Sequence, residues 1–143
     1  MYKRQRRVQA RLGPEPISIP TARNLVGQAC HRWHLPQYRH DARLIVSELT
    51  TNAVLHAGTD LVVTVSHHGS RLHVAVRDGD PRYPSLNGAD GANRVMDLAE
   101  RGWGLRLVHG LAAAWGAMPA RGGKVVWATL APATPVRQTE TPG

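Results

Sequence analysis

Cysteine is almost absent from this sequence, which has 143 residues and a single cysteine, Cys30. One cysteine excludes a disulfide within the chain and any zinc site built on several cysteines, and it fits a reducing compartment. A long apolar run is also lacking, because Arg106 and His109 interrupt the longest apolar stretch, from Leu105 to Met118. No apolar segment follows the basic N-terminal residues, as an export signal would require. We therefore expect a cytoplasmic protein that has no membrane partner.

Acidic residues are few compared with basic ones, 10 against 18, so the formal net charge is +8 at pH 7. The positive charge is most concentrated at the start of the chain, where no acidic residue lies among the basic ones: Lys3, Arg4, Arg6, Arg7 and Arg11. Residues 1–16 are therefore predicted to be a basic, flexible arm with little to bury. Such an arm could contact nucleic acid phosphates. We favour a solvated tail, because no second basic stripe accompanies it.

The rest of the chain has enough apolar content to fold. The hydrophobic fraction is 42%, which is ordinary for a globular protein of one domain. We place that domain at residues 17–132. Residues 133–143 combine proline with threonine and other polar residues, a composition that buries nothing, and they are predicted to be a disordered tail.

Apolar periodicity predicts two helices and then a hairpin. The first helix is expected from Thr21, as N-cap, to near Pro36, and the second from near Asp41 to His56. Two short β-branched runs, Leu61–Ser66 and Leu72–Arg77, follow and predict an antiparallel hairpin.

The second half of the chain begins with a long connection, from Gly79 to Gly102, that is rich in glycine, proline and aspartate. Connections of this length are often functional. A helix is then expected over Leu105–Ala112, followed by strands at Trp115–Met118 and Val125–Leu130. This order predicts a two-layer α/β sandwich with helices on one face of a mixed, largely antiparallel sheet.

Three polar residues recur on the second predicted helix. At about 100° per residue, Glu48, Asn52 and His56 fall within the same stripe as Leu44 and Leu49. A carboxylate facing the protein body needs a partner, because an unpaired buried charge is costly. One explanation is a buried hydrogen-bond network. The other is a ligand cavity in which Glu48 is a base and Asn52 is an oxygen ligand for Mg²⁺.

Two further segments help to decide between a buried hydrogen-bond network and a ligand cavity. A predicted strand ends in the sequence Asp78-Gly79-Asp80-Pro81, which places a carboxylate at a turn. Later, Gly102 and Gly104 precede a helix that begins at Leu105, where free backbone N–H groups can hold an anion. A turn and a hinge would explain each segment when it is taken alone.

In this order the three segments resemble the GHKL superfamily of ATPases, which includes gyrase, MutL, heat-shock chaperones and histidine kinases. Within it, the sequence looks like the small anti-sigma-factor serine/threonine kinases that are common in actinobacteria. The resemblance covers Ile17–Pro132. Residues Glu48–Ala57 resemble the N box, Val76–Pro81 the first glycine box and Arg101–Leu105 the second, while Gly122–Trp127 resembles the closing glycine box.

The resemblance implies a Bergerat-type sandwich with ATP and Mg²⁺ as cofactors. It implies that Glu48 is the catalytic base, that Asn52 binds the metal and that Asp78 accepts a hydrogen bond from the adenine amino group. The long connection, Gly79–Glu100, would be a lid. Lys124 stands where related ATPases often carry threonine, and it lies outside the implied site. The other cofactor-binding residues implied are His56, Asp80, Gly102, Gly104 and Leu105.

The function predicted on this basis is that of an ATP-binding regulatory protein, acting as an anti-sigma-factor-like serine/threonine kinase in a partner-switching system. Its partners would be an anti-sigma antagonist protein and a sigma factor, and a homodimer is left open. One alternative is a non-catalytic ATP-binding module that binds a partner. Another is a basic nucleic-acid-binding protein that uses the N-terminal arm. The sequence contains no Walker motif and no helical His-Glu pairing for zinc.

Overall fold

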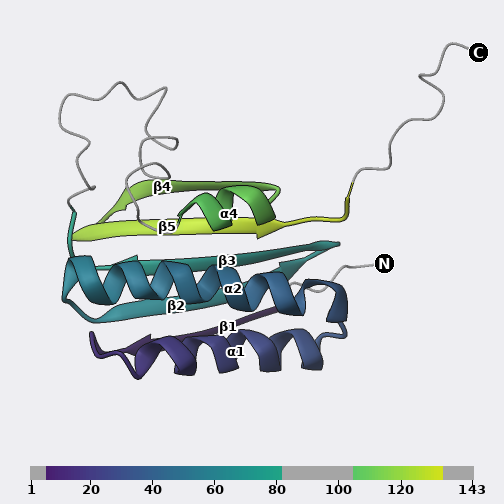
Figure 1. The fold of residues 1–143 in the computed structure, drawn as a ribbon, viewed down its shortest axis with the longest axis horizontal. Coiled ribbons are helices and arrows are strands. Elements are labelled where there is room, and N and C mark those ends of the chain that lie inside the picture. Colours follow the sequence, from purple (N-terminus) through teal and green to yellow (C-terminus); the bar gives the residue numbers. More distant parts are fainter. Residues whose placement is uncertain (1–5, 82–104, 134–143) are drawn as a thin grey trace, which may run out of the picture.

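The computed structural model describes residues 6–81 and 105–133 (Figure 1). In these residues one antiparallel sheet has the strand order β1-β2-β3-β5-β4. The α-helices lie on one face of it, as predicted for a two-layer α/β sandwich. Every described strand pair is antiparallel, in agreement with the largely antiparallel sheet that the sequence predicted. The elements are β1 (Arg6–Leu12), α1 (Ser18–Arg32), α2 (Pro36–Asn52), the π-helical turn η1 (Ala53–Ala57), β2 (Leu61–His68), β3 (Arg71–Asp78), α4 (Leu105–Leu111), β4 (Ala114–Ala120) and β5 (Gly123–Leu130).

The central hairpin follows directly from the alternating sequence. Side chains along a strand point to opposite faces in turn, so every second residue of β2 and β3 points toward the helices. These residues are fully or almost fully buried: Leu61, Val63, Val65, Leu72, Val74 and Val76. The hairpin that the sequence predicted is confirmed, and its apolar face forms the floor of the core.

Both N-terminal helices begin earlier than the sequence predicted. Helix α1 starts at Ser18, and the Thr21 hydroxyl donates to the Ile17 carbonyl at 2.8 Å instead of capping the helix. Helix α2 starts at Pro36 instead of near Asp41. Proline fits the first turn of a helix because the N–H that it lacks has no partner there. Pro36, near which the sequence predicted the end of the first helix, is therefore the first residue of α2.

The prediction of a flexible arm was wrong for residues 6–12, which form β1. This strand pairs with β2, so that Val8 lies opposite Val65 and Leu12 opposite Leu61. Val8 and Leu12 also pack against the core. The sequence Val8-Gln9-Ala10-Arg11-Leu12 alternates as a strand should, and the high charge of the segment hid this signal. Charged residues are common on edge strands because they discourage pairing with other chains.

A double substitution tests the contribution of β1. Replacing Val8 and Leu12 by alanine should lower the free energy of unfolding by about 2 kcal/mol, because it removes most of two apolar side chains that are partly buried against the core. Gln9→Ala, on the exposed side of the same strand, should change it by less than about 0.5 kcal/mol. Urea denaturation measures both changes. Equal stability of the double variant and the wild type would mean that residues 6–12 do not form this strand in solution.

Several predictions concern residues outside the described ranges. These are most of the lid at Gly79–Glu100, the glycines Gly102 and Gly104, residues 1–5 of the arm, and the tail beyond Ala133. Within the described ranges, no helix is long and apolar enough to cross a membrane.

Candidate functional site

The C-terminal half of α2 carries Glu48 and Asn52. Both side chains are partly exposed, at the margin of the buried stripe and not inside it, which corrects the sequence prediction. The reason is that the stripe is rotated around the helix from its predicted position, so that Leu44 lies only partly buried and Leu55, in η1, is 70% exposed. The side chains of α2 that face the core are Tyr38, Ala42, Ile45, Val46, Leu49 and Thr50.

No hydrogen bond or ion pair to another described residue engages the side chain of Glu48 or Asn52. The two residues are four apart on one helix, so their side chains are neighbours on its surface. The alternative explanation of a buried hydrogen-bond network is therefore not supported within the described ranges. A carboxylate and an amide oxygen stand together at the edge of the core, available to a ligand.

The helix changes its geometry immediately after Asn52. Three hydroxyls in the last turns of α2 donate to the carbonyl four residues earlier: Ser47, Thr50 and Thr51. Such bonds tend to bend a helix. The chain then continues as η1, a π-helical turn, which ends at Gly58 in a left-handed conformation with φ of 67°. π-helical turns are frequent at functional sites. This turn carries His56, which was predicted to belong to the site.

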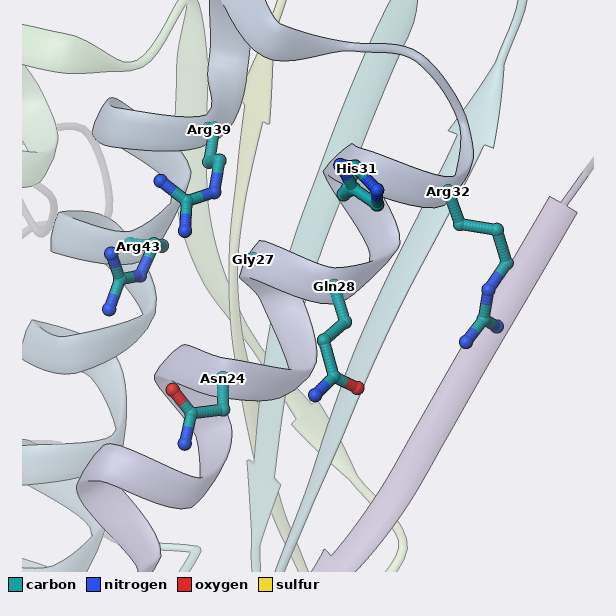
Figure 2. A pocket seen from close by; sticks show the side chains of 7 residues that line it. All are labelled: Asn24, Gly27, Gln28, His31, Arg32, Arg39 and Arg43. Carbon is teal, nitrogen blue, oxygen red and sulfur yellow. The ribbon is translucent and has the colours of Figure 1, made fainter.

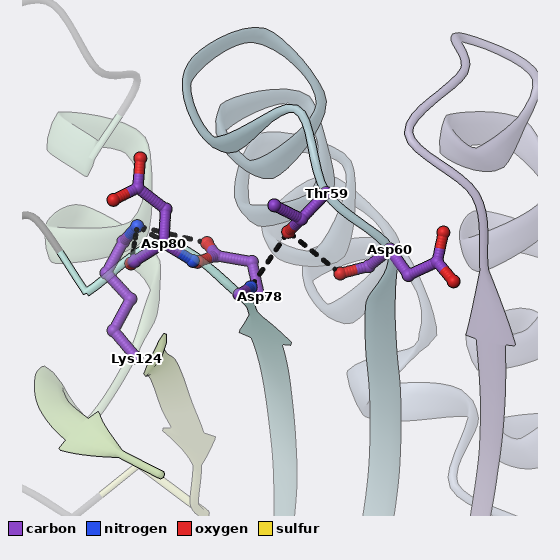
Figure 3. A network of polar contacts seen from close by, with 6 residues as sticks. Thr59, Asp60, Asp78, Asp80 and Lys124 are labelled. Atoms are coloured by element: carbon purple, nitrogen blue, oxygen red, sulfur yellow. Dashed lines mark hydrogen bonds and ion pairs between the residues drawn. The ribbon is translucent and has the colours of Figure 1, made fainter. Parts of the chain in front are cut away.

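Asp78 lies at the end of β3 and forms a buried ion pair with Lys124 of β5, its cross-strand partner (Figure 3). The Lys124 ammonium lies 3.1 Å from both carboxylate oxygens and also donates to the Asp80 carbonyl at 3.0 Å. The Asp80 backbone N–H donates to Asp78 Oδ1 at 2.9 Å. Asp78 is 5% exposed and Lys124 is 4% exposed, so the two charges are compensated almost without water.

Lys124 is the member of this site that the sequence prediction left out. Its position departs from the threonine of related ATPases, and that departure was visible in the sequence. Its partner was not visible, because Asp78 and Lys124 are 46 residues apart and only the register of β3 with β5 brings them together.

His56, in η1, is exposed and lies within the electrostatic influence of Lys124. Partial desolvation, and to a smaller extent the positive charge of Lys124, lower the pKa of His56. The imidazole is therefore neutral at pH 7 and can take part in hydrogen bonds, but it does not supply a positive charge for phosphates.

The end of β3 is held by a hydrogen bond on one side and by close backbone packing on the other. The Thr59 hydroxyl accepts a hydrogen bond from the Gly79 N–H at 2.8 Å and donates to the Asp60 carbonyl at 3.0 Å (Figure 3). This connects the loop after η1 to the segment that follows Asp78. On the other side, a Cβ on Gly123 would overlap the Asp78 carbonyl. Glycine at position 123 therefore lets β5 close against the residue that carries the buried carboxylate.

Gly123→Ala should lower the free energy of unfolding by about 2 kcal/mol, because β5 must move away from the end of β3 to relieve the overlap. Gly110→Ala is the matched control, since nothing lies within 4 Å of a Cβ there and Gly110 is in α4. That change should stabilise the protein slightly, because alanine favours a helix. Thermal unfolding compares the two variants, and similar shifts in both would contradict the close packing at Gly123.

Leu105 is the one predicted site residue of the second glycine segment that lies within the described ranges. Leu105 is the first residue of α4 and is 2% exposed, and α4 packs against α2.

Across residues 6–81 and 105–133, no group of three or more His, Cys, Asp or Glu could hold a metal. Mg²⁺ is commonly held by one or two protein oxygens together with substrate phosphates, and among the described residues the Asn52 oxygen is suited to this. The free amide of Asn52 fits that requirement.

Comparison with known families agrees with this geometry. Residues 12–130 match the histidine kinase-like ATPase domain family. The match covers most of the chain, and the protein belongs to this family. Membership implies binding of ATP, usually with Mg²⁺. No curated protein matches the chain.

Proposed function

We propose that this ATPase domain is a serine/threonine protein kinase of a partner-switching system. It would phosphorylate an anti-sigma antagonist protein in the cytoplasm and hold a sigma factor when the antagonist is absent. The observation that carries the catalytic part is the free pair Glu48 and Asn52, adjacent on α2 and without partners in the part of the chain that the structure describes. A domain that only sensed ATP would have no need for a free carboxylate beside the phosphate ligand.

The residues present suit phosphoryl transfer, which depends mainly on positioning and charge stabilisation. The hydroxyl oxygen of the partner attacks the γ-phosphorus of ATP, the bond from that phosphorus to the β,γ-bridging oxygen breaks, and ADP leaves. Glu48 takes the proton of the attacking hydroxyl. Asn52 would hold the Mg²⁺ that neutralises phosphate charge.

The Asp78 carboxylate would bind the adenine base. Oδ1 already accepts hydrogen bonds from Lys124 and from the Asp80 N–H, whereas among the described residues Lys124 is the only partner of Oδ2. A carboxylate oxygen can accept two hydrogen bonds, so Oδ2 retains one position for the adenine amino group. The ion pair with Lys124 holds the carboxylate in one position before the nucleotide arrives.

Phosphate transfer to a partner tests the proposal. The protein is incubated with ATP labelled at the γ-phosphate, Mg²⁺ and an extract of the native cell, and labelled proteins are identified by mass spectrometry. We expect label on one serine or threonine of a small protein, and no label when that residue is alanine. ATP binding without ADP formation or labelled protein would instead identify a non-catalytic ATP-binding module.

Asn52→Ala tests the metal ligand. It should weaken binding of Mg-ATP by about tenfold or more, and binding of magnesium-free ATP by less than about threefold, because only the first complex uses the amide oxygen. Asn52→Asp retains an oxygen ligand and should bind Mg-ATP better than the alanine variant does. Calorimetry measures the affinities of the wild type and of both variants. Equal losses with and without magnesium would assign Asn52 a structural role.

A further inference from the structure

A polar cavity lies between α1 and α2, in a different part of α2 from Glu48 and Asn52 (Figure 2). Its volume is about 600 Å³. Helix α1 contributes neutral amides and basic side chains, and α2 contributes two arginines one turn apart. The residues that line it, apart from one glycine, are Asn24, Gln28, His31, Arg32, Arg39 and Arg43.

The charge of this cavity is uncompensated. No carboxylate lines it, and in the described residues none of its three arginines forms an ion pair. Arg39 of α2 and Arg32 of α1 are exposed, and Arg43 is partly buried. Arg39 and Arg43 both approach Gly27, and like charges held close together repel one another, so an anion bound beside these two arginines would relieve that repulsion.

Gly27 allows the two arginines of α2 to approach α1. The Nε atoms of Arg39 and Arg43 lie 3.7 Å and 3.5 Å from the position that a Cβ on Gly27 would occupy. Figure 2 shows both side chains beside α1 at this residue. The Arg43 Nε atom is buried and has no hydrogen-bond partner in the part of the chain described. Glycine weakens the interior of a helix, so its presence at the floor of the cavity favours a role in keeping space for the guanidinium groups.

We propose that this cavity binds a small anion that carries two or more phosphoryl groups. Guanidinium groups donate two parallel hydrogen bonds to phosphate oxygens, a geometry that lysine does not provide. Asn24 and Gln28 add neutral donors at the cavity wall. The volume is in the range of small-molecule sites. The polar lining favours a compact polyanion over an apolar segment of a partner protein.

The site is separate from the proposed phosphoryl-transfer site and does not depend on it. On a helical wheel, with Glu48 at zero and about 100° per residue, Arg39 and Arg43 fall on the side of α2 opposite Glu48. Binding here therefore requires neither Mg²⁺ nor the Asn52 amide. This allows a test in the absence of metal.

The probe is inorganic tripolyphosphate, added to the full chain with EDTA and followed by nuclear magnetic resonance of backbone amides and arginine Nε–H groups. We expect the largest shifts in α1 and the first half of α2, and at Arg39 and Arg43. Arg39→Gln should weaken binding by about fivefold or more, because an exposed guanidinium that contacts phosphate is lost without harm to the core. Arg71→Gln, an exposed arginine outside the cavity, should weaken it by less than about twofold.

A second variant tests the floor of the cavity. A Cβ at position 27 would lie 3.4 Å from Arg43 Cδ, which the flexible side chain can accommodate, so Gly27→Ala should fold and yet weaken binding by crowding the guanidinium groups. Equal losses in the Arg39 and Arg71 variants, no measurable binding, or shifts confined to the residues around Asn52 and Asp78 would each overturn the proposal. Tighter binding of a glutamate-rich peptide than of tripolyphosphate would also overturn it and indicate a protein partner.

Discussion

Asp78→Asn is expected to lower the free energy of unfolding by about 3 kcal/mol or more, because it leaves the Lys124 ammonium buried without a counter-charge. The asparagine amide has nearly the shape of the carboxylate, so the loss reflects charge and hydrogen bonding, not volume. One of its polar atoms is also an NH₂ group, which cannot accept the hydrogen bonds from Lys124 and the Asp80 N–H. Urea denaturation at pH 7 measures the change.

Two controls make this result specific to the buried pair. Asp60→Asn removes the carboxylate of the exposed pair with Arg11, at 3.4 Å and with side chains 54% and 75% exposed, and should cost less than about 0.5 kcal/mol. Combining Asp78→Asn with Lys124→Met should recover part of the loss, because the uncompensated charge is then absent. Equal costs for Asp78→Asn and Asp60→Asn would mean that the Asp78–Lys124 pair is not buried in solution.

The same Asp78 variant also tests base recognition. An amide at this position can present its NH₂ group to a carbonyl, so competition between ATP and GTP should shift toward GTP, measured at a temperature where the variant is folded. An unchanged ratio would leave Asp78 with the structural role alone.

Glu48→Ala is expected to reduce phosphate transfer by at least about 100-fold, because a general base acts in the transition state. ATP affinity should stay within about threefold, since the carboxylate contributes little to ground-state binding. Stability should change by less than about 0.5 kcal/mol, because Glu48 is partly exposed and has no ion-pair partner in the described residues. Labelled ATP, calorimetry and urea denaturation on one preparation measure the three quantities.

The neighbouring Ser47→Ala is the control for Glu48. The Ser47 hydroxyl donates to the Arg43 carbonyl within α2, so its loss affects only the helix and should leave transfer intact. A Glu48 variant that is destabilised but still active would contradict the catalytic assignment. An equally stable variant that binds ATP without transferring phosphate would support it.

The features predicted from sequence are those whose cause is local. The alternation of apolar residues in β2 and β3 defines both strands and the face they bury, whatever the remainder of the chain does. The four-residue spacing of Glu48 and Asn52 likewise places them together on any helix. Both features lie within residues 12–130, which match the histidine kinase-like ATPase domain family.

What the sequence alone determined is therefore the helices and strands that follow β1, the sandwich of helices on a sheet, and the residues of the proposed catalytic pair. The tertiary structure decided the rest. Whether the charged segment Arg6–Leu12 is an arm or a strand depends on the free edge of β2. The exposure of Glu48 depends on how α2 is rotated against the sheet, and the burial of Lys124 depends on a register that joins residues 46 positions apart. All three depend on contacts between residues that are far apart in the sequence. The energy of such a contact comes from a partner that no local pattern specifies.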